Sequence, residues 1–421
     1  MTEVLEAPLH NWSGTYRYQA HTIHQPRTVD ELQALIARGG SLHTLGTRHS
    51  FNDIADAPEL ISLTELPGEP VIDATARTVT VPARIRYGEL AVLLQEAGWA
   101  LSNLASLPHI SVAGSVATAT HGSGSGNPTL ASAVNAMTLI SGTGDLVHLD
   151  HGSPDFAGAV VHLGALGVVT ELELAIEPTY NMRQDLYQRL PWDTLTGSFE
   201  EVMNSGSSVS VVSDFAADTA QLLWVKTRLV DDEPRQMPGI LFGATAATEQ
   251  LHMTPGNNPL HCTPQLGEPG PWCDRIPHFL LGYNPSTGSE IQSEYLLDRR
   301  HATGAVEALR ELGPSIAPLI QSAEIRTIAA DELWLSPGYR RDCFGIHFTW
   351  RPDRDPVTAA VTRIEAALAP YEPRPHWAKV FAGPFNFDHL YPRLADFRTL
   401  AAEYDPRHIF RTPYLLRTVL G

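Results

Sequence analysis

Residues 105–124 read Ala-Ser-Leu-Pro-His-Ile-Ser-Val-Ala-Gly-Ser-Val-Ala-Thr-Ala-Thr-His-Gly-Ser-Gly, and this stretch says most about the fold. Its side chains are mostly small, and it contains no Asp, Glu, Lys or Arg. Small side chains let a backbone approach a bulky ligand closely. A flexible Ser/Gly linker is the alternative, but Val112, Val116 and the lack of charge argue against it, since linkers are usually more polar. The stretch predicts a wall that binds pyrophosphate through hydroxyl and amide groups.

The same stretch lacks the Gly-x-Gly-x-x-Gly fingerprint, and no acidic residue follows at the required offset, which disfavours a Rossmann fold. Around it, the first 180 residues alternate between helical and strand patterns. Thr28 to Glu31 reads as a helix capping box, and Leu172, Leu174 and Ile176 alternate with acidic residues as in a half-buried strand.

A second candidate segment is Leu45-Gly46-Thr47-Arg48-His49-Ser50, which follows a short predicted strand. A Gly-containing turn after a strand exposes backbone N–H groups that can hold phosphate oxygens. Many surface turns have this composition, so the segment taken alone favours an ordinary turn with a solvated histidine.

Polar side chains share one face of several predicted strands beyond residue 181. In residues 344–350, alternation places His347 and Thr349 on one face and aromatic or aliphatic residues on the other. Glu324 pairs with Arg326 in the same way, and Gln292 with Glu294. The pattern fits a sheet that covers a polar ligand and a solvent-facing sheet equally well.

His376-Trp377-Ala378-Lys379 is the fourth candidate. A lysine in a partly dry pocket can stabilise an alkoxide or take a proton, although a surface lysine beside a buried tryptophan is the more frequent case.

Composition narrows the classes of function. The 421 residues carry 29 Lys and Arg against 47 Asp and Glu, a net charge of −18, which disfavours nucleic acid and anionic membranes as partners. Three cysteines without a CxxC pair give neither a disulfide framework nor a zinc site, so we expect no metal. With no leader pattern and no apolar run of about 20 residues, we expect a cytoplasmic protein.

Taken together and in this order, the four segments resemble the vanillyl-alcohol-oxidase-type flavoproteins and, within them, the aldonolactone/alditol oxidase group. Asn11 to Gly14 and Tyr391 to Leu394 support the resemblance. It implies an α+β fold with a PCMH-type FAD-binding domain (1–180), an α/β substrate domain whose mixed sheet covers the flavin (181–383), and a C-terminal segment that packs back on the FAD domain (384–421).

The resemblance also implies site residues. His49 matches the histidine bonded to the flavin 8α-methyl, so FAD would be covalently attached. The expected cofactor-binding residues are Thr44, Leu45, Gly46, Thr47, Arg48, His49, Ser50, Ser106, Ser111, Gly114, Thr118, Ala119, Thr120, His121, Val169, Thr349 and His376. The expected substrate-binding residues are Ser106, Gln292, Glu324, Arg326, Thr349 and Lys379, and the expected catalytic residues are Glu324, Arg326, His347 and Lys379.

The implied reaction is oxidation of the terminal C1 hydroxyl of an alditol such as xylitol or sorbitol, with hydride transfer to flavin N5 and reoxidation by dioxygen to hydrogen peroxide. A monomer is expected. An aldonolactone oxidase, a dehydrogenase that uses another acceptor, and a non-catalytic flavin- or sugar-binding protein remain alternatives. One departure concerns the flavin loop, which usually reads Gly-Ser-Gly-His-Ser. Here Thr47 and Arg48 replace residues with greater backbone freedom.

Overall fold

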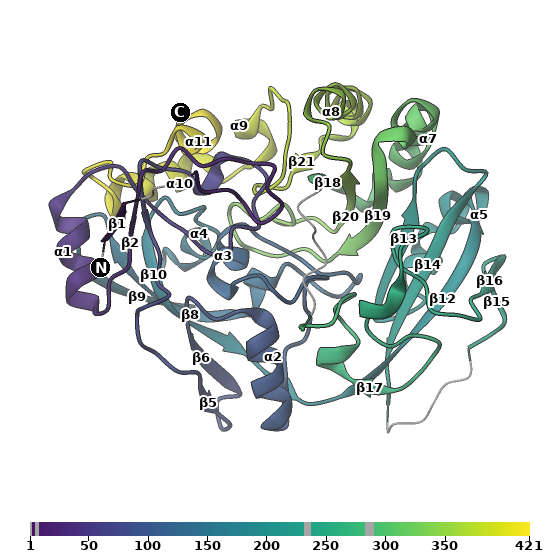
Figure 1. The fold of residues 1–421 in the computed structure, drawn as a ribbon, viewed down its shortest axis with the longest axis horizontal. Coiled ribbons are helices and arrows are strands. Elements are labelled where there is room, and N and C mark those ends of the chain that lie inside the picture. Colours follow the sequence, from purple (N-terminus) through teal and green to yellow (C-terminus); the bar gives the residue numbers. More distant parts are fainter. Residues whose placement is uncertain (1, 5–7, 231–236, 283–289) are drawn as a thin grey trace.

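The computed structural model describes residues 2–4, 8–230, 237–282 and 290–421. Two halves of the chain lie side by side (Figure 1), and the described residues form two large hydrophobic cores. The first core draws on residues from Leu32 to Ile176 and on the C-terminal tail, and it also includes Trp272 and Trp377. The second core lies within residues 187–368. Segments beyond residue 181 therefore contribute to both cores.

The first half of the chain contains two main sheets. The smaller has the order β1-β2-β4-β3, with parallel pairing of β2 and β3 to β4, and comprises β1 (Thr2–Val4), β2 (Thr22–His24), β3 (Leu42–Thr44) and β4 (Glu59–Ile61). The larger is antiparallel, with the order β5-β6-β10-β8-β9, and comprises β5 (Val71–Asp73), β6 (Thr78–Pro82), β8 (Val134–Ser141), β9 (Leu146–Asp150) and β10 (Gly167–Ala175). Two short strands, β7 (Trp99–Ala100) and β11 (Glu177–Pro178), pair separately.

The helices of this half are α1 (Val29–Arg38), α2 (Tyr87–Glu96), α3 (Val112–Ala117) and α4 (Phe156–Ala159). Thr28 caps α1 as predicted, because its hydroxyl accepts a hydrogen bond from the Glu31 amide at 3.1 Å.

A ten-stranded sheet dominates the second half, with the order β15-β16-β12-β14-β13-β19-β20-β18-β21 and β17 paired to β12. Its strands are β12 (Asn181–Pro191), β13 (Ser208–Ser213), β14 (Thr219–Arg228), β15 (Ile240–Leu241), β16 (Ala244–Ala246), β17 (Gly270–Pro271), β18 (Ile291–Asp298), β19 (Ile320–Ile328), β20 (Cys343–Trp350) and β21 (Arg374–Pro375). Among the described strands every pairing is antiparallel, whereas we expected a mixed sheet. The helical connection between β18 and β19 makes these two strands parallel to each other, but β20 lies between them.

The two faces of this sheet differ as the alternation in residues 344–350 predicts. Phe344, Ile346, Phe348 and Trp350 are fully buried in the second core, and each such side chain contributes about 1.5–3 kcal/mol by burial. Helices α7 (Ala302–Ile316) and α8 (Arg354–Leu368) cover this side (Figure 1). The shorter α5 (Trp192–Gly197) and α6 (Phe199–Met203) also pack into this core. The opposite face, with His347 and Thr349, borders a cavity.

The tail returns to the first half of the chain. It forms α9 (Phe387–Leu390), α10 (Leu394–Tyr404) and α11 (Pro413–Leu415), and Phe397, Tyr414 and Val419 join the first core.

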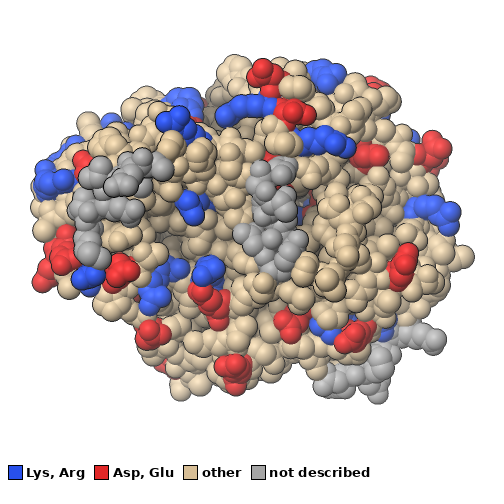
Figure 2. Space-filling model, viewed as in Figure 1, with Lys and Arg blue, Asp and Glu red and all other residues tan. Residues whose placement is uncertain are grey.

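No helix in the described residues is long and apolar enough to cross a membrane. On the face shown in Figure 2, basic and acidic side chains are interspersed rather than gathered by sign.

Candidate active site

A cavity of about 650 Å³ lies between the two halves of the chain, a volume in the usual range of small-molecule and cofactor sites. Its walls come from the loop after β3, from residues 105–121, from the polar face of β18–β20, and from residues 376–379. Residues more than 300 positions apart thus meet at one site.

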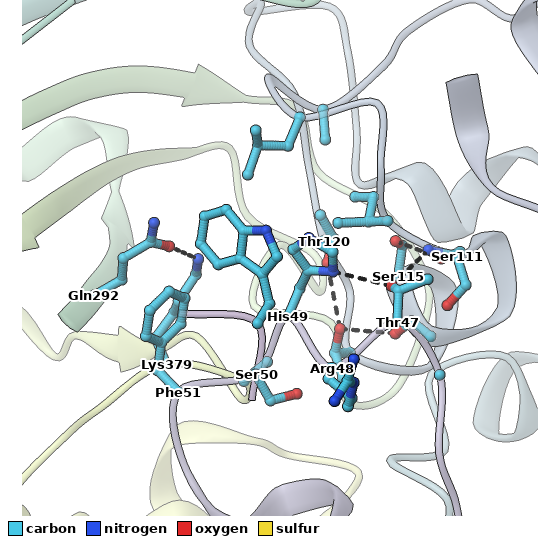
Figure 3. Close-up of a pocket in the computed structure, with 18 of the residues that line it drawn as sticks. Thr47, Arg48, His49, Ser50, Phe51, Ser111, Ser115, Thr120, Gln292 and Lys379 are labelled. Atoms are coloured by element: carbon cyan, nitrogen blue, oxygen red, sulfur yellow. Dashed lines mark hydrogen bonds between the residues drawn. The ribbon is translucent and has the colours of Figure 1, made fainter. Parts of the chain in front are cut away.

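His49 lies in the middle of this cavity, between Thr47, Ser111 and Ser115 on one side and Lys379 with Gln292 on the other (Figure 3). Its Nδ1 is 3.0 Å from Thr47 Oγ1, and Nε2 is buried with no hydrogen-bond partner among the described residues. Burial, followed by the charge of Lys379, lowers the pKa of His49 to about 3. The ring is therefore neutral and presents a nitrogen that can act as a nucleophile.

Arg48 stands where the family loop usually has a glycine, and its backbone has a conformation that glycine adopts more readily. Its φ of 62° lies in the left-handed region, where glycine is favoured and other residues are strained. The Arg48 guanidinium binds the carbonyl of His10, and the Arg48 carbonyl accepts from the Trp12 amide, so contacts with the N-terminal segment hold this conformation. The Trp12 ring lies 4.9 Å from the His49 ring.

Residues 105–124 pack directly against this loop. The Ser111 amide, which precedes α3, donates to Thr47 Oγ1 at 3.1 Å. A Cβ atom added at Gly46 or Gly114 would lie 2.9 or 2.8 Å from Ser111 Oγ. A side chain at either glycine would therefore crowd the Ser111 hydroxyl, and Gly46 lets the loop after β3 approach residues 105–124 beside the cavity. Ala119 is an exception among the expected residues, because a positive φ of 53° turns it into the first core.

The sheet contributes two rows of polar side chains from neighbouring strands. Gln292, Thr349 and Ser322 form one row. Glu294, His347 and Glu324 form the next.

Glu294 is the link between the sheet and residues 105–124. Its Oε1 lies 3.1 Å from His121 Nε2, and its Oε2 lies 3.5 Å from His347 Nδ1. Burial raises the pKa of Glu294, but the two imidazoles outweigh this and hold the pKa well below its usual range. Burial lowers the pKa of His347, with partial compensation by Glu294, so His347 is neutral and able to accept a proton.

Glu324 lies behind the cavity wall rather than in it, so its expected contact with substrate stays a prediction. It is 1% exposed, and its carboxylate pairs with Arg326, whose guanidinium does reach the cavity. The segment around His278 covers Glu324, with His278 Nε2 3.2 Å from Glu324 Oε1.

The backbone of residues 377–379 is held by hydrogen bonds from the loop that carries His49. The Asn52 side-chain amide donates to the carbonyls of Trp377 and Lys379, both at 2.8 Å, and the Phe51 amide donates to the Ala378 carbonyl. The Lys379 ammonium donates to Gln292 Oε1 and lies 4.9 Å from the Phe51 ring (Figure 3). Burial lowers the pKa of Lys379 to about 8.

The structure brings together every other expected residue along one cavity. These are Thr44, Leu45, Gly46, Thr47, Arg48, His49, Ser50, Ser106, Ser111, Gly114, Thr118, Thr120, His121, Val169, Gln292, Arg326, His347, Thr349, His376 and Lys379. Several wall residues were not among the expected site residues, namely Trp12, Glu290, Glu294, Gln321, Ser322, Phe279 and part of residues 252–261. Strand alternation had placed Glu294 on the polar face with Gln292 but assigned it no role, and the same alternation could have identified Ser322, whereas residues 252–261 have no periodic pattern.

The residues that line the cavity are suited to binding FAD. The unpartnered His49 nitrogen and the glycine and serine wall are the features that a covalently held, pyrophosphate-containing cofactor needs. In the described parts of the chain, no group of three or more His, Cys, Asp or Glu side chains is placed to hold a metal ion.

Comparison with known proteins supports FAD as the cofactor. Residues 20–150 match the family described as FAD binding domain, and residues 286–418 match D-arabinono-1,4-lactone oxidase. An alditol oxidase from Streptomyces sp. is 45% identical over 96% of this chain and 97% of its own length. An L-gulono-1,4-lactone dehydrogenase from Mycobacterium tuberculosis is 26% identical over 98% of both chains.

Among solved structures, cholesterol oxidase from B. sterolicum superposes with a TM-score of 0.80 at 14% identity, covering 99% of this chain and 97% of that one, which shows a shared fold. The chain is an FAD-dependent oxidoreductase, and it belongs to the alditol oxidase family.

Proposed function

We propose that this protein oxidises the terminal hydroxyl of an open-chain alditol, such as xylitol or sorbitol, to the aldose, with FAD attached through His49. The observation that carries the proposal is the meeting of a neutral His49, the cationic groups of Arg326 and Lys379, and a neutral His347 at one cavity. In this arrangement residues 1–180 with the C-terminal tail would hold the cofactor, and residues 181–383 would supply the substrate face.

The chain's own residues would prepare the substrate hydroxyl. His347 accepts its proton at Nε2, since the Glu294 carboxylate on the Nδ1 side favours the tautomer with hydrogen on Nδ1. Lys379 and Arg326 stabilise the charge that develops on the oxygen. Ser106 and Thr349 orient neighbouring hydroxyl groups. The loop after β3 and residues 105–121 would hold FAD, which would supply the hydride acceptor for the carbon, and dioxygen would receive the two electrons as hydrogen peroxide.

The test begins with acid precipitation of the purified protein. We expect the yellow colour to stay with the pellet and to be lost from the pellet of the His49→Ala variant. We also expect xylitol and sorbitol to release peroxide. If the colour washes out of the wild-type pellet, the covalent link is wrong. If no alditol reduces the flavin, the substrate assignment is wrong.

A second candidate is oxidation of an aldonolactone. The match of residues 286–418 to the D-arabinono-1,4-lactone oxidase family favours it, because these residues include most of the proposed substrate face. Including a gulonolactone in the same assay separates the two, and anaerobic reduction without peroxide release in air would indicate a dehydrogenase.

A further inference from the structure

The chain contains only two lysines, Lys226 and Lys379, among its 29 basic residues. Lys379 lines the cavity, whereas Lys226 on β14 is 3% exposed and lies behind the cavity wall. A buried lysine needs specific partners, because desolvation of an ammonium group is costly. The residues that Lys226 contacts therefore indicate its role.

Lys226 begins a chain of polar contacts that ends at the cavity. Its ammonium donates to the Ile276 carbonyl and lies 3.4 Å from His278 Nδ1. His278 Nε2 lies 3.2 Å from Glu324 Oε1, and the other Glu324 oxygen accepts from Arg326. Arg326 then reaches the cavity.

The donors and acceptors of this chain fix its direction. Burial raises the pKa of Glu324, but Arg326 is the main influence that outweighs this and holds the pKa well below its usual range. A carboxylate can only accept, so His278 Nε2–H donates to Glu324 and His278 Nδ1 is left to accept from Lys226. Burial lowers the pKa of His278 to about 4, which agrees with a neutral ring. The ring also packs edge-on against Trp224 at 4.5 Å, and Trp224 is held in turn by a hydrogen bond to Gln184.

His278 also contacts the opposite wall of the site. Its backbone amide donates to the Ser106 carbonyl at 3.1 Å. One residue therefore connects Glu324 on the sheet to Ser106 in the 105–124 segment. Arg326 depends on this support, since its Nε has no hydrogen-bond partner in the described chain.

We propose that His278, oriented by Lys226, is a positioning residue for substrate binding. It holds Glu324 so that Arg326 faces the same cavity as Ser106. This inference rests on the proposed function. His278 acts through Glu324 and does not touch the substrate.

A double-mutant cycle tests the coupling. Stopped-flow reduction of the flavin by xylitol under anaerobic conditions separates the substrate dissociation constant from the limiting rate. We expect His278→Leu to raise the dissociation constant about 10- to 100-fold, the usual effect of losing a hydrogen bond to a charged group, with a smaller change in the limiting rate. Adding His278→Leu to Glu324→Gln should cost little more than Glu324→Gln alone.

Two further variants separate positioning from general damage to the fold. His278→Gln keeps an N–H donor for Glu324 and should recover most of the affinity. His24→Gln is the matched control, because His24 is a buried histidine 2.6 Å from a glutamate, Glu59, outside the cavity. It should leave the dissociation constant unchanged. Additive effects in the cycle, or equal defects in the Leu and Gln variants, would overturn the inference.

A wild-type enzyme that no alditol reduces would overturn both the proposed function and the role of His278 in binding alditols. The contacts from Lys226 through His278 to Glu324 are then tested by ¹⁵N NMR of histidine-labelled protein. The His278 signal is assigned by its loss in His278→Gln. Hydrogen on Nε2 is the expected tautomer. Hydrogen on Nδ1, or a doubly protonated ring at neutral pH, would refute the arrangement whatever the substrate.

Discussion

Lys379→Met is the most informative perturbation of the proposed mechanism, because it removes the ammonium group that is proposed to stabilise the reacting oxygen. With a pKa of about 8, Lys379 is about 90% charged at pH 7 and about 10% charged at pH 9. If the charged form stabilises the alkoxide, flavin reduction is fast below pH 8 and falls to about a tenth of its plateau by pH 9. The variant should be about 10²- to 10³-fold slower, the usual cost of losing such a group, and its alkaline limb should disappear.

The assay is anaerobic stopped-flow reduction at saturating xylitol between pH 5.5 and 10. An acid limb below pH 6.5, from protonation of His347, should persist in the variant. Lys379→Arg is the matched control, because arginine stays charged throughout and should remove the alkaline limb while retaining more of the rate.

Because the chain has only two lysines, NMR of ¹³C-lysine-labelled protein can measure the pKa of Lys379 directly, with Lys379→Met as the assignment. A measured pKa near 10.5 would refute the argument from burial. An alkaline limb that remains near pH 8 in Lys379→Met would refute the assignment of that limb to this residue.

Three further predictions concern other parts of the site. Glu294→Gln should slow flavin reduction about 10- to 100-fold and move the acid limb to lower pH, since the carboxylate raises the pKa of His347; an unmoved limb in the pH–rate profile would contradict this. Gly114→Ala should destabilise the protein by about 1–3 kcal/mol in denaturant unfolding, with partial recovery on adding Ser111→Ala, because the new methyl lies 2.8 Å from the serine oxygen; unchanged unfolding would show that the contact relaxes freely. Burial lowers the pKa of His162 to about 4, below its value in the unfolded chain, so the unfolded state binds a proton first and stability should fall as the pH drops from 6.5 to 4, by about 3 kcal/mol for this residue. His162→Asn should show a smaller drop in thermal midpoint over that range, and an equal drop would exclude His162 as the source.

Alternation of polar and apolar residues along the sequence predicted the parts of the site that lie on β-strands. Alternation alone placed His347 and Thr349 on the face opposite Phe348, since side chains of a strand point to alternate sides. It could not say whether that polar face meets solvent or a ligand, because the answer depends on packing against a distant segment.

The remaining differences come from tertiary contacts that have no local signal. Pairing of β19 with β20 puts Glu324 beside His347. Burial of Glu324, however, depends on the irregular segment around His278, which covers the Glu324 side chain. Ala119 leaves the cavity wall through a single positive φ that its residue type does not predict. The meeting of His49 with Lys379, across 330 positions, entered the predictions only through the family resemblance.

The Asn52 amide has a consequence for how such proteins can be rearranged. The Asn52 side chain donates to the carbonyls of Trp377 and Lys379 and so joins them to the loop that carries His49, and the Phe51 backbone amide donates to the Ala378 carbonyl. The proposed point of cofactor attachment, His49, and the Lys379 ammonium are thereby parts of one unit built from both ends of the chain. A chimera that exchanges residues 1–180 between two relatives must bring residues 376–379 along, or the reacting groups lose their mutual alignment even when both halves fold.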